Sequence, residues 1–164
     1  MTKEKSVICR ETFTSLVEPL LGLPISRPHE GYGKAIVIHL GQLSDSGYRR
    51  RDGTMVQEGE ASFMLEGAWR VERDKSVWFS STSCITKRQL GLDSLLNKSI
   101  QAIHLMGRLP ELSVHLSNNL WIQSFGFSGE ESEWAVFLTT GGWVCSEFGE
   151  VVFVNANDLN SSAI

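Results

Sequence analysis

The sequence predicts an α+β fold in which antiparallel β-strands dominate and one or two short helices cover an open side. Three observations lead to this prediction. Short apolar runs recur from residue 35 to residue 154, only two segments show helical spacing, and the turn signals between the runs suit tight hairpins. So many short strands fit curled antiparallel sheets or a partly open barrel. The length of 164 residues suits a single domain, residues 1–164, with its own hydrophobic core.

Two segments are expected to form short helices. Apolar residues recur at helical spacing over residues 11–22, where Pro19 should bend or shorten the helix. Residues 22–33 are crowded with glycine and proline and are expected to form a loop. A second helix is predicted over residues 86–97, although Gly91 lowers its intrinsic propensity.

The other periodic segments predict strands, and residues 44–60 between two of them are expected to form a long polar loop. Residues 111–116 alternate between apolar and polar side chains, as a strand with one buried face does. Asn118 and Asn119 tolerate positive φ, so their flanking strands should form an antiparallel hairpin. The predicted strands cover residues 35–40, 62–72, 76–80, 99–106, 111–117, 120–127, 133–139 and 143–154, the last with a break near Gly149.

The compartment is predicted from the cysteines and from the N-terminal residues. Cys9, Cys84 and Cys145 are widely spaced and form no CxxC pair, so we expect reduced thiols rather than disulfides or a zinc site. The N-terminal residues lack the apolar segment of a signal peptide, and no stretch is apolar enough to span a membrane. A cytoplasmic protein without a membrane partner is the resulting expectation.

Charge is distributed unevenly along the chain. Residues 109–164 contain seven carboxylates and no lysine or arginine, a formal charge of -7. Residues 1–108 hold all 15 basic residues against 12 acidic ones, a formal charge of +3. Such asymmetry bears on partners and electrostatic steering rather than on fold. The two halves could also neutralise each other within one fold.

The acidic half supplies the first candidate partner-binding residues. Three of its carboxylates lie in an expected hairpin loop between two strands, which does not suit a buried catalytic pair. Two more lie in the last predicted strand pair. The candidates are Glu130, Glu131, Glu133, Glu147 and Glu150.

The basic half contains one dense cluster, formed by Arg49, Arg50 and Arg51 next to Tyr48. Clusters of this kind can grip phosphates and stack bases. A net charge of -4 and an isoelectric point near 5.6 argue against a nucleic-acid partner for the whole chain. We therefore expect the three arginines to lie in a solvated loop, where they contact carboxylates or a protein partner.

No motif indicates catalysis, a metal or a cofactor. His39, His104 and His115 each lie between two apolar residues of a predicted strand and are expected to face water, whereas His29 lies in the proline-rich loop. Neither HxH, HExxH nor a glycine-rich phosphate motif occurs. Cys84 with His104 or His115 as base would form a nucleophile pair, but no spacing selects it. We predict no catalytic residue, no metal and no cofactor, and an enzyme is the less favoured class.

Five tryptophans lie in predicted strands. Most are expected in the core, and any near a sheet edge would serve as interface anchors. Trp and His side chains could instead line a pocket for a small molecule.

Part of the chain resembles a recurring type of small bacterial protein. The resemblance rests on LLNKSIQAIHL, ELSVHLSNNLWIQSF and ESEWAVFL within residues 95–138, with a looser match at EGAWRVE, residues 66–72. Some proteins of this type are similar to immunity proteins encoded beside polymorphic toxins. The resemblance implies binding of a partner protein and supplies no catalytic residues.

Charge and resemblance predict the same function, a protein-binding module whose acidic surface binds a basic partner such as a nuclease toxin. The alternative is a small-molecule-binding or enzymatic β-barrel with a pocket lined by Trp and His. A homodimer in which the acidic half meets the basic half of a second copy is a third hypothesis.

Overall fold

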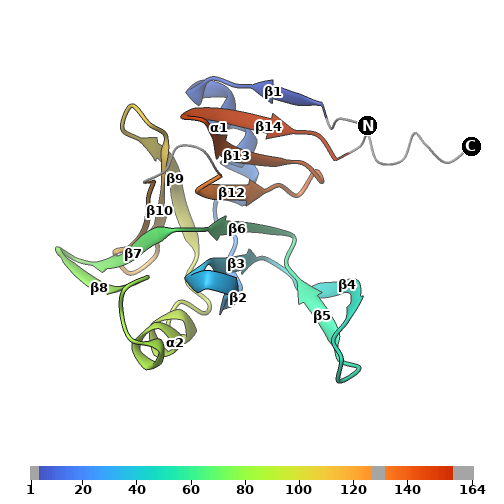
Figure 1. Cartoon of the computed structure of the whole chain (residues 1–164), viewed down its shortest axis with the longest axis vertical. Coiled ribbons are helices and arrows are strands. Elements are labelled where there is room, and N and C mark those ends of the chain that lie inside the picture. The colour runs from blue at the N-terminus through green and yellow to red at the C-terminus, as the bar shows by residue number, and fades with distance from the viewer. Residues whose placement is uncertain (1–3, 127–131, 157–164) are drawn as a thin grey trace, which may run out of the picture.

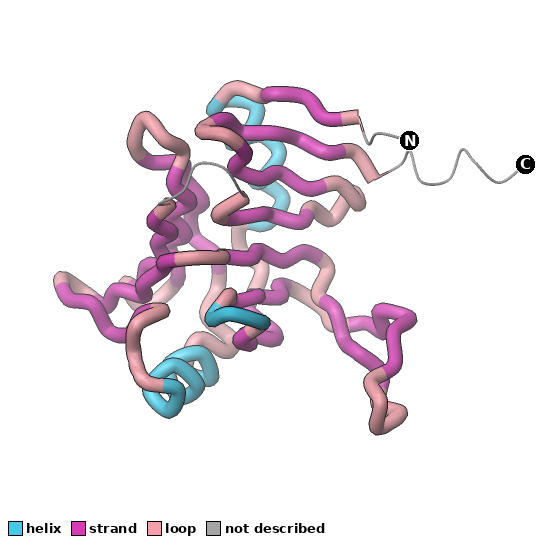
Figure 2. Tube along the Cα trace, viewed as in Figure 1, coloured by secondary structure: helices cyan, strands magenta, loops and turns pink. Residues whose placement is uncertain are grey.

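The computed structural model describes residues 4–126 and 132–156 and arranges their strands in three antiparallel sheets (Figure 1). Strands predominate over helices along the whole described trace (Figure 2). The predicted β-dominant α+β class, with antiparallel sheets and short helices, is thus confirmed. The sheets do not close into a barrel.

The largest sheet has seven strands, and a two-residue turn joins its neighbouring strands β13 and β14. Its N-terminal strand β1 pairs with β14, so both ends of the described chain meet at one edge. In spatial order the strands are β1 (Lys5–Val7), β14 (Glu150–Val154), β13 (Trp143–Glu147), β12 (Trp134–Phe137), β6 (Ala61–Leu65), β3 (Ile36–Leu40) and β2 (Ile25–Glu30).

The second sheet has five strands, and a two-stranded hairpin stands apart from both sheets. Only residues 66–67 separate β6 in the first sheet from β7 in the second, so the chain turns a corner there. The five strands, in spatial order, are β8 (Ser76–Ser80), β7 (Ala68–Arg73), β11 (Leu120–Phe125), β10 (Glu111–Leu116) and β9 (Ile100–Met106). The hairpin consists of β4 (Ser44–Arg49) and β5 (Met55–Glu58).

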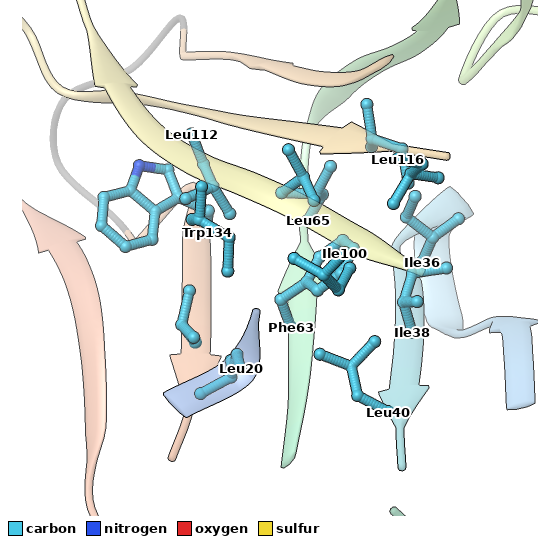
Figure 3. Packing of buried hydrophobic residues seen from close by; sticks show 14 of the residues in the cluster. Leu20, Ile36, Ile38, Leu40, Phe63, Leu65, Ile100, Leu112, Leu116 and Trp134 are labelled. Atoms are coloured by element: carbon cyan, nitrogen blue, oxygen red, sulfur yellow. The ribbon is translucent and has the colours of Figure 1, made fainter. Parts of the chain in front are cut away.

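One hydrophobic core lies between the two large sheets. Successive side chains of a strand point to opposite faces, so each strand contributes every second residue to it. Trp134 is fully buried there, donates from Nε1 to the Pro110 carbonyl oxygen at 2.7 Å and meets Phe13 edge-on at 5.8 Å. Figure 3 shows the facing side chains, among them Ile36, Ile38, Phe63 and Leu65 of the first sheet and Ile100, Leu112 and Leu116 of the second.

The first helix packs against the core on the side of β9. Helix α1 (Arg10–Val17) buries Phe13 and Val17, and its Arg10 guanidinium donates to the Leu105 carbonyl oxygen at 2.6 Å and to that of Gly107. As predicted, Pro19 shortens the helix, because a 3₁₀ turn, η1 (Glu18–Leu20), replaces its last turn.

The second helix packs between the edge strands β2 and β8. Helix α2 (Ile85–Asp93) is joined to β2 by Arg88, which donates to Glu30 at 2.7 Å. A Cβ atom at Gly91 would lie 2.5 Å from the Phe79 ring, so the helix can approach the core closely only because this residue is glycine. Tertiary packing thus requires Gly91, although glycine has a low intrinsic propensity for helix. A short 3₁₀ turn, η2 (Tyr32–Lys34), precedes β3.

Three local expectations were wrong. Residues 22–33 are not all loop, because β2 forms at the sheet edge, where Pro28 is tolerated although it has no N–H group. Residues 44–60 form the β4–β5 hairpin, whose strands are mostly exposed and thus lack an apolar alternation. The strand predicted over residues 62–72 divides at the corner between the sheets. Strand β1, with three exposed residues, was not predicted.

Candidate functional site

The outer face of each large sheet lies at the molecular surface, because the two helices pack at the openings between the sheets. Residues on these faces alternate with the core residues of the same strands. Each face gathers side chains from strands that are far apart in the sequence. The two faces are therefore the places to look for binding sites.

One end of the seven-stranded sheet brings acidic and exposed apolar side chains together. Glu147 and Glu150 are paired across β13 and β14, and the same register places Glu133, next to β12, opposite Glu147. The tight turn between β13 and β14 holds Phe148, which is 69% exposed. Leu109 is 64% exposed and reaches this turn from the β9–β10 connection. Its Cδ2 atom lies 3.3 Å from the point that a Cβ atom at Gly149 would occupy. We call Glu133, Glu147, Glu150, Leu109 and Phe148 the acidic end.

An ion pair covers the small side chains next to the acidic end. The Lys5 ammonium contacts Glu147 Oε1 at 2.8 Å, and this hydrogen bond raises the pKa of Lys5. Lys5 belongs to β1, so its side chain passes over the row that contains Cys145 and Val152. Both of those residues are buried although they lie outside the main core. Burial raises the pKa of the Cys145 thiol.

Ion pairing inside the described chain accounts for little of the charge asymmetry. The three salt bridges are Lys5 with Glu147, Arg70 with Glu72 and Arg88 with Glu30. Among the described residues, only the first joins the basic half to the acidic half. Glu150 is exposed and makes no ion pair within the described ranges, and Arg108, next to Leu109, is likewise exposed. Exposed Glu150 thus remains available to an external partner.

The structure does not bring the arginine cluster to the acidic end. Arg49, Arg50 and Arg51 are exposed where β4 turns toward β5, beside Tyr48, which is 74% exposed. This hairpin projects from the body on the side away from the β13–β14 turn (Figure 1). A hydrogen bond from Arg49 Nη1 to the Gly53 carbonyl oxygen, 3.0 Å long, ties its tip together. Glu130 and Glu131, the other predicted acidic residues, lie outside the described residues.

His39 differs from its prediction. It lies on the outer face of the seven-stranded sheet, as expected, but it is only 9% exposed because the His29 ring stacks on it at 5.3 Å. The Gly59 N–H donates to His39 Nδ1 at 3.2 Å, which requires that nitrogen to be unprotonated. Burial, followed by the positive charges of His29 and Arg27, lowers the pKa of His39 to about 4. Among the described residues, no three His, Cys, Asp or Glu side chains are grouped to hold a metal.

The five-stranded sheet carries a different arrangement, an open hollow of about 680 Å³ on its outer face. Its lining includes Trp121 and His104, two residue types that the sequence suggested for a pocket. His115 stacks behind Trp121, with ring centres 4.0 Å apart and planes 11° apart. Cys84 is exposed, precedes α2 and does not line this hollow, so it forms no nucleophile pair with His104 there.

Sequence reasoning missed the polar residues of the hollow. Arg70, Ser113 and Gln123 lie on three neighbouring strands and face the same side. Their alternation with apolar neighbours marks each of them as outward-facing, but it does not show which strands are neighbours.

No helix in the described part of the chain has the length and apolar character needed to cross a bilayer. No family model, curated protein or solved structure matches the chain. Function is therefore inferred from surface geometry and charge.

Proposed function

We propose that this chain is a cytoplasmic protein-binding module whose acidic end docks on a basic partner protein. The observation that carries the proposal is the position of Phe148 and Leu109. Two large apolar side chains project from adjacent turns beside the cross-strand pair of Glu147 and Glu150. Hydrophobic anchors surrounded by charge are the usual composition of a transient protein interface.

Each component of the acidic end has a distinct role in this proposal. Phe148 and Leu109 lose their exposed apolar surface on docking, which stabilises the complex. Glu133 and Glu150 attract a basic surface from a distance and so raise the association rate. Glu147 already contacts Lys5, and a partner cation would share or replace that exposed ion pair.

The resemblance of residues 95–138 to small bacterial immunity proteins supports the same class of function. Those residues include Leu109 and the β9–β10 and β10–β11 pairs. An immunity-like protein would bind a toxin, and a nuclease toxin with a basic substrate-binding surface suits an acidic partner.

The test is capture of proteins from the lysate of the native host on immobilised chain, washed in steps of rising salt. The acidic variant Glu133→Gln, Glu147→Gln, Glu150→Gln is compared with the matched control Glu18→Gln, Glu58→Gln, Asp93→Asn, which changes net charge equally at exposed sites elsewhere. We expect a basic protein on the wild type and on the control, eluting at moderate salt, and its loss from the acidic variant. Retention by all three proteins would contradict docking at the acidic end.

The same variants distinguish a homodimer from a heterologous complex. Size-exclusion chromatography of the wild type at low and high salt reports self-association. If the arginine hairpin of one copy bound the acidic end of another, Arg49→Gln, Arg50→Gln, Arg51→Gln would abolish a salt-sensitive dimer. We expect a monomer at both salt concentrations, and a dimer with that behaviour would replace the heterologous partner in the proposal.

A further inference from the structure

We propose that the outer face of the five-stranded sheet carries a second site, which binds a neutral saccharide in a groove between aromatic and polar side chains. This site goes beyond the function proposed for the acidic end and does not depend on it. None of the residues of the acidic end lines the hollow of about 680 Å³ on this face. We call this hollow the transverse groove because its base runs across the strands.

The base of the groove is a row of four polar residues on neighbouring strands. Backbone register pairs Arg70 with Gln123, Gln123 with Ser113, and Ser113 with His104. The row crosses β7, β11, β10 and β9 on one face. With strands about 4.8 Å apart it extends about 14 Å, enough for a short oligosaccharide rather than one ring.

Two aromatic residues flank this row along β11, one on each side. Trp121 lies two residues before Gln123 and is supported from behind by the stacked His115 ring. Phe125 lies two residues after Gln123, and the Arg70 guanidinium carbon lies 4.5 Å from its ring centre. His115 covers one face of the Trp121 ring and does not line the groove. The groove therefore lies at the other face of that ring. These contacts hold the aromatic surfaces in place before a ligand arrives.

Several polar groups of the groove make no hydrogen bond with the described protein. His104, the Ser113 hydroxyl and Trp121 Nε1 have no such partner within residues 4–126 and 132–156, and Ser113 is only 1% exposed. The Gln123 amide nitrogen makes one long bond, 3.3 Å, to the Ser124 carbonyl oxygen. The groove therefore offers both donors and acceptors, as a polyhydroxylated ligand requires.

Charge in the groove disfavours an ionic ligand. Arg70 already contacts Glu72 at 2.6 Å, and both Glu111 oxygens accept hydrogen bonds, from the Ser124 hydroxyl and the Gly126 N–H, at 2.6 Å each. Asp74 accepts from Asn119 at 3.1 Å. With one cation and three carboxylates, the groove has a net negative charge that repels phosphates. Because the carboxylates already accept hydrogen bonds or form an ion pair, a cationic ligand would gain less by binding to them.

A sugar ring matches this combination of surfaces. Its C–H groups form an apolar face that can stack on an aromatic ring, while its hydroxyls project from the edge toward polar groups. The exposed side of Trp121 supplies the first contact, and Gln123, Ser113 and His104 supply the second. Open pockets that combine an apolar wall with a few convergent polar groups are the usual form of small-ligand sites.

The test uses an array of neutral oligosaccharides ending in glucose, galactose, mannose, xylose or N-acetylglucosamine, followed by calorimetric titration of those that bind. Trp121→Ala should lower the association constant at least tenfold, and Gln123→Ala should lower it severalfold. Trp143→Ala removes a tryptophan from the outer face of the other sheet and should leave binding within twofold of wild type. Thermal melts confirm that each variant is folded.

Three outcomes would overturn the saccharide site. The first is the absence of binding to every oligosaccharide on the array by folded wild-type protein. The second is saccharide binding that Trp121→Ala leaves unchanged. The third is preferential binding of a lysine-rich peptide at the groove, detected as competition that Trp121→Ala abolishes. Variants of the acidic end should not alter saccharide binding, so failure of this site and failure of the proposed protein docking are separately observable.

Discussion

The outer face of the seven-stranded sheet carries a mainly apolar cluster with carboxylates at one end, whereas that of the five-stranded sheet carries a polar row between aromatic residues. Both sheets contribute their opposite faces to the same core. Phe148 and Leu109 are exposed at the end of the first face, while Trp121 and Phe125 line a hollow on the second. The same strand alternation thus places exposed apolar and acidic side chains at the end of one sheet and an open hollow on the other, and each of the two proposed sites rests on one of these features.

The largest expected effect comes from breaking the core that both faces share. Trp134→Ala removes a fully buried ring and leaves the Pro110 carbonyl without its donor, which should lower the free energy of unfolding by about 3–5 kcal/mol. Urea denaturation measures this loss. Phe137→Ala, on the outer face of the same strand, should cost at most about 1 kcal/mol because this residue is 37% exposed. Equal losses in the two variants would contradict this assignment of core and surface.

A second prediction concerns pH, because the two faces hold their histidines differently. His39 is buried against His29 on the seven-stranded sheet, whereas His104 is exposed in the transverse groove. The unfolded chain protonates His39 near its ordinary pKa of 6.5, but the folded protein does so only near pH 4. The contribution of neutral His39 to the free energy of unfolding should therefore be fully present above pH 6.5. It should fall by up to about 3 kcal/mol as the pH decreases from 6.5 toward 4.

Urea denaturation of wild type and His39→Gln across that range isolates this effect from the titration of carboxylates. The variant cannot gain a proton at residue 39, so the difference between the two free energies of unfolding should shrink or reverse as the pH falls. Parallel curves would show that the His39 ring is not buried in its neutral form.

Electrostatic steering gives a third, smaller effect. Glu147→Gln with Glu150→Gln should slow association with the captured partner about three- to tenfold at low salt, because long-range attraction accelerates encounter. Stopped-flow mixing at several salt concentrations measures the rate constant. The dissociation rate should change less than in Phe148→Ala, which removes contact area instead. An association rate that does not respond to salt in the wild type would contradict steering.

The smallest expected effect concerns the Lys5 side chain, which passes over Cys145 on the outer face of the seven-stranded sheet. Cys9 and Cys84 are exposed and should react quickly with a chromogenic disulfide reagent, while buried Cys145 should react slowly, because burial raises its pKa and limits access. Lys5→Ala removes the side chain that passes over Cys145 and should accelerate its reaction severalfold. Unchanged kinetics would mean that Lys5 does not cover this row.

The sequence predicted local elements better than it predicted the surfaces. The hairpin around Asn118 and Asn119 was predicted correctly because both residues adopt the positive φ that such turns need. The β4–β5 hairpin was missed because none of its strand residues is fully buried and the sequence shows no apolar alternation. Strand β2 was missed because Pro28 marks a loop unless the strand is known to lie at an edge.

The candidate surfaces depend on strand order, which alternation does not encode. Glu133, Glu147 and Glu150 were predicted individually, but their common row results from the pairing of β12, β13 and β14. The four residues at the base of the transverse groove come together because β7 pairs with β11 and β9 pairs with β10. His39 was expected to face water because nothing in its own strand indicates the stacked His29 ring.

The central claim is that the two outer faces bind different classes of partner. Two-dimensional ¹H–¹⁵N NMR of the labelled protein, titrated separately with the captured basic protein and with the best oligosaccharide from the array, tests it directly. The partner protein should shift amide signals of residues 147–150 and of Leu109, and the oligosaccharide those of Arg70, His104, Ser113 and Gln123. If both ligands shifted the amide signals of the same residues, the account would be contradicted. It would also be contradicted if the partner protein shifted no amide signal on either outer face.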